Sequence, residues 1–432
     1  MRRRHGPLLI AALALVAAVV ALVVVLHNRG DDTDKKAAGG EPLAYVPAGS
    51  DDVVLDLDTR EPLVALAVED LAPRLTKNAV TSEQVHPLLG GRAVVATHAG
   101  KAWLIFATGQ PAPRPSQGAA AAANDGVVVI APSRAELAAS LHGARQPSAK
   151  YARATFDKRF AGMPAGAGAR VAFDPRPLLA QRAPQIANTP WARSLRDGAA
   201  VLTTSGNELH LPFRITADPV GLKPADLPIA TGAAPPSARG KAPLIAGVRD
   251  PAHTLAFLRA AKVLPALDVL NELPGILRPD LNDLGPNGTV TSPALDLNRL
   301  TVRSEPAEPK IWSTRLKVIA GLAGKLGFSG ADVEEHDGAY TITADGKLVG
   351  RVGVFGDVLV LSNDPTADLR AAANAPPVPT PPGAAGALTV RLNPSVLGDL
   401  IPALVRDRLS DVTGWARAEL TGVNGELRLA VR

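Results

Sequence analysis

Apolar and polar positions follow two recurring patterns along this chain. Apolar runs bounded by turn residues predict buried strands, each followed by a segment with helical spacing: Val127–Ile130 with Ser133–Leu141, and Val358–Leu361 with Thr366–Ala373. Alternating runs joined by turn residues predict hairpins: Arg92–Thr97 with Ala102–Thr108, and Tyr340–Thr343 with Leu348–Phe355. Hairpins interleaved with helices indicate the α+β class with largely antiparallel sheets.

The same order of elements occurs twice. The strand-to-helix junctions Arg170–Pro175 and Thr389–Pro394 match, and each half closes on a hairpin: Ala200–Thr203 with Glu208–Leu211, and Ala416–Glu419 with Glu426–Leu429. Asp174 and Asn393 lie 219 residues apart, and Glu208 and Glu426 lie 218 apart. The starts of the halves, Val53–Leu57 and Leu244–Val248, fit less well, and Leu264–Glu308 has no counterpart. We therefore predict an internal duplication, with chance similarity of short segments as the alternative.

Proline-rich stretches suggest how the chain is divided. Asp218–Pro243 predicts a boundary, whereas Ala375–Ala385 and Gly109–Asn124, which contains the alanine run Ala119–Ala123, predict loops inside domains. The predicted organisation is a cytoplasmic stub, transmembrane anchor and stalk in 1–40, a first α+β domain in 41–218, a Pro-rich linker in 219–243 and a second α+β domain in 244–432.

The run from Pro7 to Leu26 contains no charged or polar side chain. A helix of about 20 apolar residues spans roughly 30 Å, the hydrocarbon thickness of a bilayer. Arg2–Arg4 precede the run and aspartates follow it, which predicts a cytoplasmic N-terminus and an extracytoplasmic remainder. The alternative is a cleavable signal peptide, but the run is long and ends in Val23–Leu26, where such a peptide needs small residues.

The basic excess of the chain belongs to this N-terminal segment. Of 432 residues, 46 are Lys or Arg and 41 are Asp or Glu, for a formal net charge of +5. Residues 1–30 hold four of the basic residues and no acid, which leaves 42 basic against 41 acidic residues. A nucleic-acid partner is therefore not expected, because binding would need basic charge clustered on the folded part. The chain has no cysteine, so its stability must come from buried apolar surface.

Acidic or amide residues at strand ends are the usual place to look for catalysis. Here they precede proline four times: Asp174–Pro175, Asp250–Pro251, Asp364–Pro365 and Asn393–Pro394. We interpret them as helix caps, since Asp and Asn accept from free helix amides and proline suits the first helical position. Ser133–Glu136 has the pattern of a capping box. Asp56 and Asp58 alternate along a strand, which predicts one solvated face.

Other searches for chemistry yield no candidate. The eight histidines form no H-x-H or H-x-x-x-H pair, and the acidic run near Asp51 lacks the glycine and glutamate of an EF-hand. Gly321–Leu326 has no Ser or Thr after its Gly-Lys pair, and Gly327–Gly330 misses the nucleophile-elbow spacing. We predict no catalytic, cofactor-binding or metal residues, and no cofactor. The histidines are His5, His27, His86, His98, His142, His210, His253 and His336.

Several short motifs resemble a bacterial family, domain of unknown function 3352. They are Tyr45–Ser50 before the strand Val53–Leu57, Gly90–Gly91 before a strand, Asp125–Gly126 before Val127–Ile130, and Phe173–Pro175. The resemblance covers about residues 41–216 well and the second half more weakly. It implies one N-terminal membrane span, an extracytoplasmic region and an Ala-, Gly- and Pro-rich composition typical of actinobacteria. It carries over no catalytic or ligand-binding residue.

Together these observations favour a single-pass envelope protein with a non-enzymatic role. Its expected partners are the membrane, through Pro7 to Leu26, and an envelope protein or lipid. Two alternatives stay open: an envelope hydrolase whose site is assembled from distant residues, and a carrier of lipid or another apolar ligand.

Overall fold

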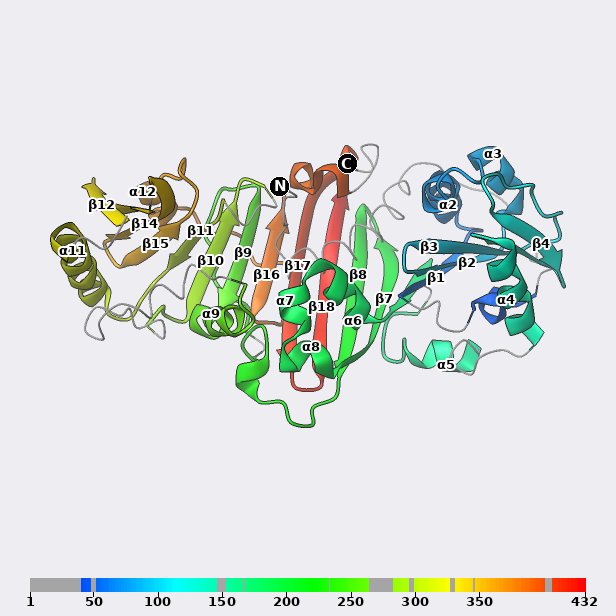
Figure 1. Ribbon diagram of the computed structural model, residues 1–432, viewed down its shortest axis with the longest axis horizontal. Helices are drawn as coiled ribbons and strands as arrows, with labels where there is room; N and C mark the ends of the chain where they lie inside the picture. The colour runs from blue at the N-terminus through cyan, green and yellow to red at the C-terminus, as the bar shows by residue number, and fades with distance from the viewer. Residues whose placement is uncertain are drawn as a thin grey trace.

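The computed structural model describes residues 40–47, 52–145, 153–165, 168–232, 234–263, 283–294, 299–326, 331–344, 346–400 and 406–432. Within these residues the chain forms one antiparallel sheet of 18 strands with short helices on its faces (Figure 1). This mixed α/β architecture with a large antiparallel sheet agrees with the predicted class. The predicted span Pro7 to Leu26 lies outside the described ranges. Inside them, no helix has the length and apolar character needed to cross a bilayer.

Apart from β4, the strands of the first half come from the predicted hairpins and apolar runs. They are β1 (Val53–Asp58), β2 (Arg92–His98), β3 (Lys101–Ala107), β4 (Ala120–Asn124), β5 (Val127–Ala131), β6 (Ala169–Phe173), β7 (Leu195–Ser205) and β8 (Glu208–Ala217). The second half supplies β9 (Leu244–Arg249), β10 (Asn287–Ser292), β11 (Thr301–Ser304), β12 (Ala331–His336), β13 (Ala339–Ala344), β14 (Lys347–Phe355), β15 (Val358–Ser362), β16 (Leu388–Leu392), β17 (Leu409–Glu419) and β18 (Gly422–Val431).

The helices are short, and many begin at a proline, as expected where no N–H is lost. They are α2 (Pro62–Leu75), α3 (Ser82–Val85), α4 (Arg134–Arg145), α5 (Arg153–Lys158), α6 (Pro175–Arg182), α7 (Pro184–Ala187), α8 (Pro190–Ser194), α9 (Pro251–Ala260), α11 (Pro309–Leu326) and α12 (Leu369–Ala373). The 3-10 segments are η2 (Pro42–Tyr45), η3 (His86–Leu88), η4 (Pro224–Asp226) and η6 (Pro394–Leu400).

Backbone pairing sets the order of strands across the sheet. From one end to the other it is β4, β5, β3, β2, β1, β6, β7, β8, β18, β17, β16, β9, β10, β11, β15, β14, β13, β12, with every neighbouring pair antiparallel. Figure 1 shows this sheet running from β4 on the right to β12 on the left. The stretch Leu264–Glu308, for which the sequence offered no counterpart, supplies β10 and β11. They follow β9 as β2 and β3 follow β1.

Apolar side chains are buried on both faces of the sheet. In the first half, α2 and α3 cover one face through Val64, Val68 and Val85. On the opposite face, η2 and α5 contribute Leu43 and Phe156. The hydrophobic core under α2 and α3 continues past the β8–β18 pair to Leu397 in η6 and Leu409 in β17. The two halves therefore share a core as well as a sheet.

The range 219–243, predicted as a linker, packs against the sheet. Leu227 and Ile229 are buried beside Trp191 and Phe257, and Arg239 forms a backbone bridge to Pro377. The predicted ranges 41–218 and 244–432 are in direct contact, because β8 pairs with β18 along most of its length.

Two predictions of secondary structure are wrong. The stretch ending at Asn124 was expected to be a loop throughout, but Ala120–Asn124 forms the edge strand β4. Alanine has low strand propensity, so tertiary pairing with β5 decides the outcome. The helix expected from Thr366 begins at Leu369, and Asp368 caps it by accepting from the Ala371 N–H at 2.9 Å.

Candidate functional site

The most concentrated charged cluster of the first half is built on strand β1. Period-two geometry places Val54, Asp56 and Asp58 on one face of that strand. Strands β2 and β6 flank β1 on its two sides. Arg170 of β6 lies directly opposite Asp56, and Arg92 of β2 lies opposite Asp58 and so diagonal to Asp56. The strand pairing alone thus brings two guanidinium groups to one carboxylate.

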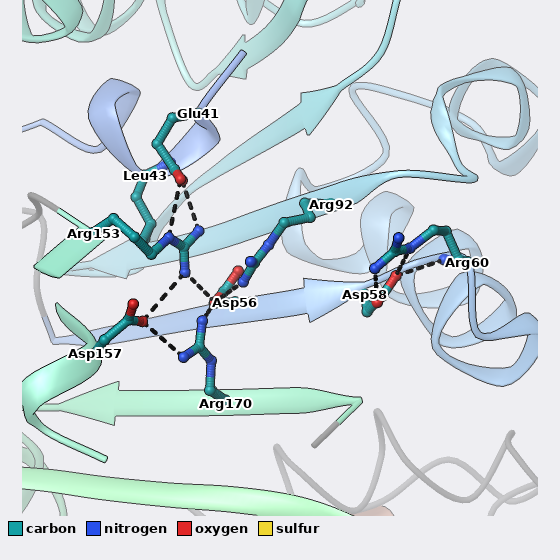
Figure 2. A network of polar contacts seen from close by, with 9 residues as sticks. All are labelled: Glu41, Leu43, Asp56, Asp58, Arg60, Arg92, Arg153, Asp157 and Arg170. Carbon is teal, nitrogen blue, oxygen red and sulfur yellow. Dashed lines mark hydrogen bonds and ion pairs between the residues drawn. The ribbon is translucent and has the colours of Figure 1, made fainter. Parts of the chain in front are cut away.

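Three arginines converge on Asp56, and we call these four residues the arginine hub (Figure 2). One carboxylate oxygen, Oδ2, accepts from Arg153 Nη1 at 2.8 Å, from Arg170 Nη2 at 2.5 Å and from Arg92 Nη2. The Asp56 side chain is fully buried, whereas the arginine side chains are 22–39% exposed. The arginine side chains are therefore partly exposed while the carboxylate is not.

Two further carboxylates balance the charge of the hub. Glu41 accepts from Arg153 at both oxygens, at 3.0 Å from Nε and 2.7 Å from Nη2. Asp157 accepts from Arg170 Nη1 at 2.8 Å and lies 3.7 Å from Arg153 Nη1. Three cations thus face three anions, and the cluster has no surplus charge with which to attract a charged ligand.

Aromatic rings of α5 and the turn after it hold the guanidinium of Arg170 in place. It lies 5.4 Å from the centroid of Phe160 and 5.7 Å from that of Phe156. Phe156 is fully buried, so its position is set by the core. Cation–π contacts of this kind are worth about 0.5–2 kcal/mol each. The arginine is thereby restricted to the orientation that meets Asp56.

Burial and charge act in opposite directions on Asp56. Burial alone would raise the pKa of this carboxyl, but hydrogen bonds from Arg153 and the charge of Arg92 hold its pKa below the usual range. Desolvation alone would lower the pKa of Arg153, but its hydrogen bonds to Glu41 and to Asp56 raise that pKa above the usual value. The prediction of a solvated Asp56 is therefore wrong. Asp58, its neighbour on that face, is 29% exposed and pairs with Arg60.

The hub also holds the first residues that the structure describes. Glu41 lies directly before η2, whose Leu43 and Tyr45 are buried. The Tyr45 hydroxyl donates to the Asn124 backbone carbonyl at 3.1 Å and accepts from the Asn124 side-chain Nδ2 at 2.8 Å. We call Glu41, Tyr45, Asp56 and Arg153 the entry clamp. The sequence offered no signal for it, because Arg153 and Glu41 lie 112 positions apart.

The four predicted caps divide into three that cap and one that does not. Asp174 accepts from the Arg176 N–H, Asp250 from the His253 N–H and Asn393 from the Ser395 N–H. Each stands directly before its helix or 3-10 turn.

Asp364 has another role. Its Oδ1 accepts from the backbone and hydroxyl of Thr366 at 2.9 and 2.7 Å, and Arg299 pairs with it at 3.2 Å, in a turn that precedes no helix directly. In the predicted capping box, the Ser133 hydroxyl accepts from the Glu136 N–H, but the Glu136 carboxylate pairs with Lys101 at 2.6 Å.

A second feature of the described residues is a pocket among short helices. An open pocket of about 360 Å³ lies between α7, α8, η4 and α9, with Gln185, Asn188, Asp226, Phe257 and Lys262 in its lining. Among the residues that the structure describes, no three His, Asp or Glu side chains are grouped closely enough to hold a metal ion.

Comparisons with known proteins find structural neighbours only. No family model matches the chain, and no curated protein matches it. Two crystal forms of TP0453 are similar in part. Form III shares 15% identity with a TM-score of 0.29, covering 43% of this chain and 82% of that one. Form I shares 14% identity with a TM-score of 0.28, covering 43% and 81%.

Proposed function

We propose that this chain is a single-pass, membrane-anchored extracytoplasmic protein with a non-enzymatic binding or envelope-structural role. Its anchor is the apolar run Pro7 to Leu26, and its expected partner is an envelope protein or lipid. The observation that carries the proposal is the entry clamp, which holds the chain where the predicted stalk meets the folded part. The resemblance to domain of unknown function 3352 remains a prediction consistent with this role.

The entry clamp suits a tethered protein because it stops the start of the fold from fraying. Chain segments near a domain end are commonly loose unless side chains tie them down. Here the bidentate Glu41–Arg153 pair and the buried Tyr45 fasten the segment to α5 and β4, and Arg153 in turn binds Asp56 of β1. Bidentate pairs of arginine with carboxylate are directional as well as strong. A force that pulls on the stalk would therefore be transmitted to the sheet.

The continuous sheet supports the scaffold part of the proposal. Both halves contribute to one run of paired strands from β4 to β12 (Figure 1). The shared core beneath the β8–β18 pair resists bending between the halves. A long, rigid surface held at a membrane can present partner-binding faces at a fixed distance from the bilayer.

Single-cysteine labelling of the full chain in intact cells tests the topology, because the natural sequence has no cysteine. Val220, 85% exposed on a loop, is replaced in Val220→Cys. His5→Cys is the matched control on the predicted cytoplasmic stub. A membrane-impermeant maleimide should label Val220→Cys from outside and His5→Cys only after permeabilisation. Labelling of both positions only in lysed cells, or a protein released by alkaline carbonate, contradicts the proposal.

Native mass spectrometry distinguishes the scaffold from the carrier alternative. The full chain, extracted in mild detergent from the membrane in which it was expressed, should give the mass of the polypeptide without a retained apolar ligand. A reproducible added mass that survives detergent exchange would favour a carrier of lipid or another apolar ligand.

A further inference from the structure

The sheet ends in two strands that differ in how they are protected. Within the described residues, β4 pairs only with β5, and β12 pairs only with β13. Each therefore presents one edge of backbone N–H and C=O groups to its surroundings. Natural proteins protect such edges with charged side chains, prolines or bulges.

Strand β12 carries this protection and β4 does not. The six residues of β12 include Asp332, Glu334 and Glu335. The five residues of β4, Ala120–Asn124, have no charge and no proline, and their pairing with β5 is regular. Both faces of β4 are in contact with the fold, through Ala121 on one core and Asn124 on Tyr45 of the other. Among the described residues, the other edge of β4 has no strand partner.

The proposed tether enters the fold beside this edge. Gly40, the first residue before the entry clamp, packs against the β4–β5 turn so closely that an added Cβ would lie 2.6 Å from the Asp125 carbonyl oxygen. If the stalk leads to a membrane anchor, every copy holds its β4 edge next to its point of attachment. Copies anchored in one membrane then hold their β4 edges at a similar distance from the bilayer, which raises the effective concentration of these edges.

We infer that β4 is a pairing edge for a second copy of this chain. The two β4 strands would lie antiparallel about a two-fold axis at Ala122, with Ala120 opposite Asn124 of the other copy. Identical strands related by a two-fold axis form a closed, self-complementary contact. The chain already joins its own halves by an antiparallel pair of strands, β8 with β18. Alanines opposite one another bring neither a bulky contact nor charge repulsion.

This inference rests on the proposed membrane anchor only for its concentration argument, and disulfide trapping tests the pairing directly. Residues directly opposite in an antiparallel pair have Cα atoms about 4.5–5.5 Å apart, within the range that a disulfide spans. Ala122→Cys in the full, membrane-bound chain should therefore give a dimer of twice the chain mass under mild oxidation. Glu334→Cys on β12 is the matched control at the charged edge and should stay monomeric.

A second substitution shows that the edge, and not chance collision, brings the cysteines together. Ala123 is exposed, so Ala123→Lys adds a charge at the edge without burying it. In the Ala122→Cys background it should reduce the dimer to the level of Glu334→Cys. Equal cross-linking by Ala122→Cys and Glu334→Cys overturns the inference, as does an adduct whose mass is not twice that of the chain.

The failure of this inference and that of the proposed function are separable. Absence of the dimer, together with external labelling of Val220→Cys, overturns the β4 pairing alone. Labelling of Val220→Cys only in lysed cells overturns the anchor. The purified full chain in detergent, at raised concentration, then decides the pairing by the same cross-link and the same control.

Discussion

Replacing Asp56 by Asn removes the charge at the centre of the arginine hub while keeping its volume. Three guanidinium groups then lose their shared buried anion. Removing one partner of a buried ion pair typically costs about 3–5 kcal/mol. Arg153 keeps Glu41 and Arg170 keeps Asp157, and all three arginine side chains are partly exposed. We therefore expect a loss near the lower bound, about 3 kcal/mol of unfolding free energy.

Asp58→Asn is a matched control on the same strand and the same face. Asp58 is 29% exposed and its partner Arg60 is 53% exposed. Exposed pairs contribute about 0–1 kcal/mol, so this variant should lie close to the natural protein. Urea unfolding of the full chain in detergent, followed by tryptophan fluorescence, measures both. Trp103 reports on the affected region, because it is buried in the same core as Phe156.

The pH dependence gives an independent readout of the hub. The pKa of Asp56 in the folded protein is depressed below its ordinary value of 3.8. A depressed carboxyl contributes stability that is present above its unfolded pKa and is lost as the pH falls through the folded pKa. The gap between the natural protein and Asp56→Asn should hold from pH 7 to pH 5 and shrink below about pH 4. Equal stabilities of Asp56→Asn and Asp58→Asn at pH 7 would refute this account of the hub.

Two further stability predictions concern close packing and a buried hydroxyl. Gly198→Ala should cost about 1–3 kcal/mol in urea unfolding, because its Cβ would lie 2.2 Å from the buried ring of Phe173; Gly350→Ala, whose nearest atom is 3.5 Å away, should change stability little. Thr59→Val should cost about 2–3 kcal/mol, since the buried Thr59 hydroxyl donates to the Gly91 carbonyl at 2.7 Å and accepts from the Gly91 N–H at 3.2 Å. Thr59→Ser should keep both bonds, and a Thr59→Ser as damaging as Thr59→Val would show that the methyl group matters instead.

Local patterns predict most elements of this fold because they depend on neighbours in sequence. The helix expected at Ser133–Leu141 is α4, and the caps at Asp174 and Asp250 act as caps. These outcomes follow from side-chain spacing and from the free amides of a helix start.

The arginine hub could not be predicted in this way. The alternation around Asp56 was identified correctly, but that face is buried because η2 and α5 pack on it, and its arginines come from β2 and β6, which flank β1. Arg153 comes from α5, far along the chain. The strand β4 was missed for the same reason, since an alanine run becomes a strand only where an open neighbour such as β5 accepts it.

The centre of the sheet has a symmetry that bears on the origin of the fold. The paired elements β7 with β17, and β8 with β18, each begin and end 214 residues apart. Across the central pair, Pro212 lies opposite Glu426, and these two residues are also 214 apart. Glu208 faces Ala430 and Thr216 faces Gly422, so a two-fold axis through the Pro212–Glu426 pair exchanges the strands. The spacing of 214 between the two hairpins in the structure is four residues shorter than the spacing of 218 that the sequence match gave. We infer a duplication in which two copies of one unit fused edge to edge, because an unrelated pair of domains would have no reason to meet at equivalent residues.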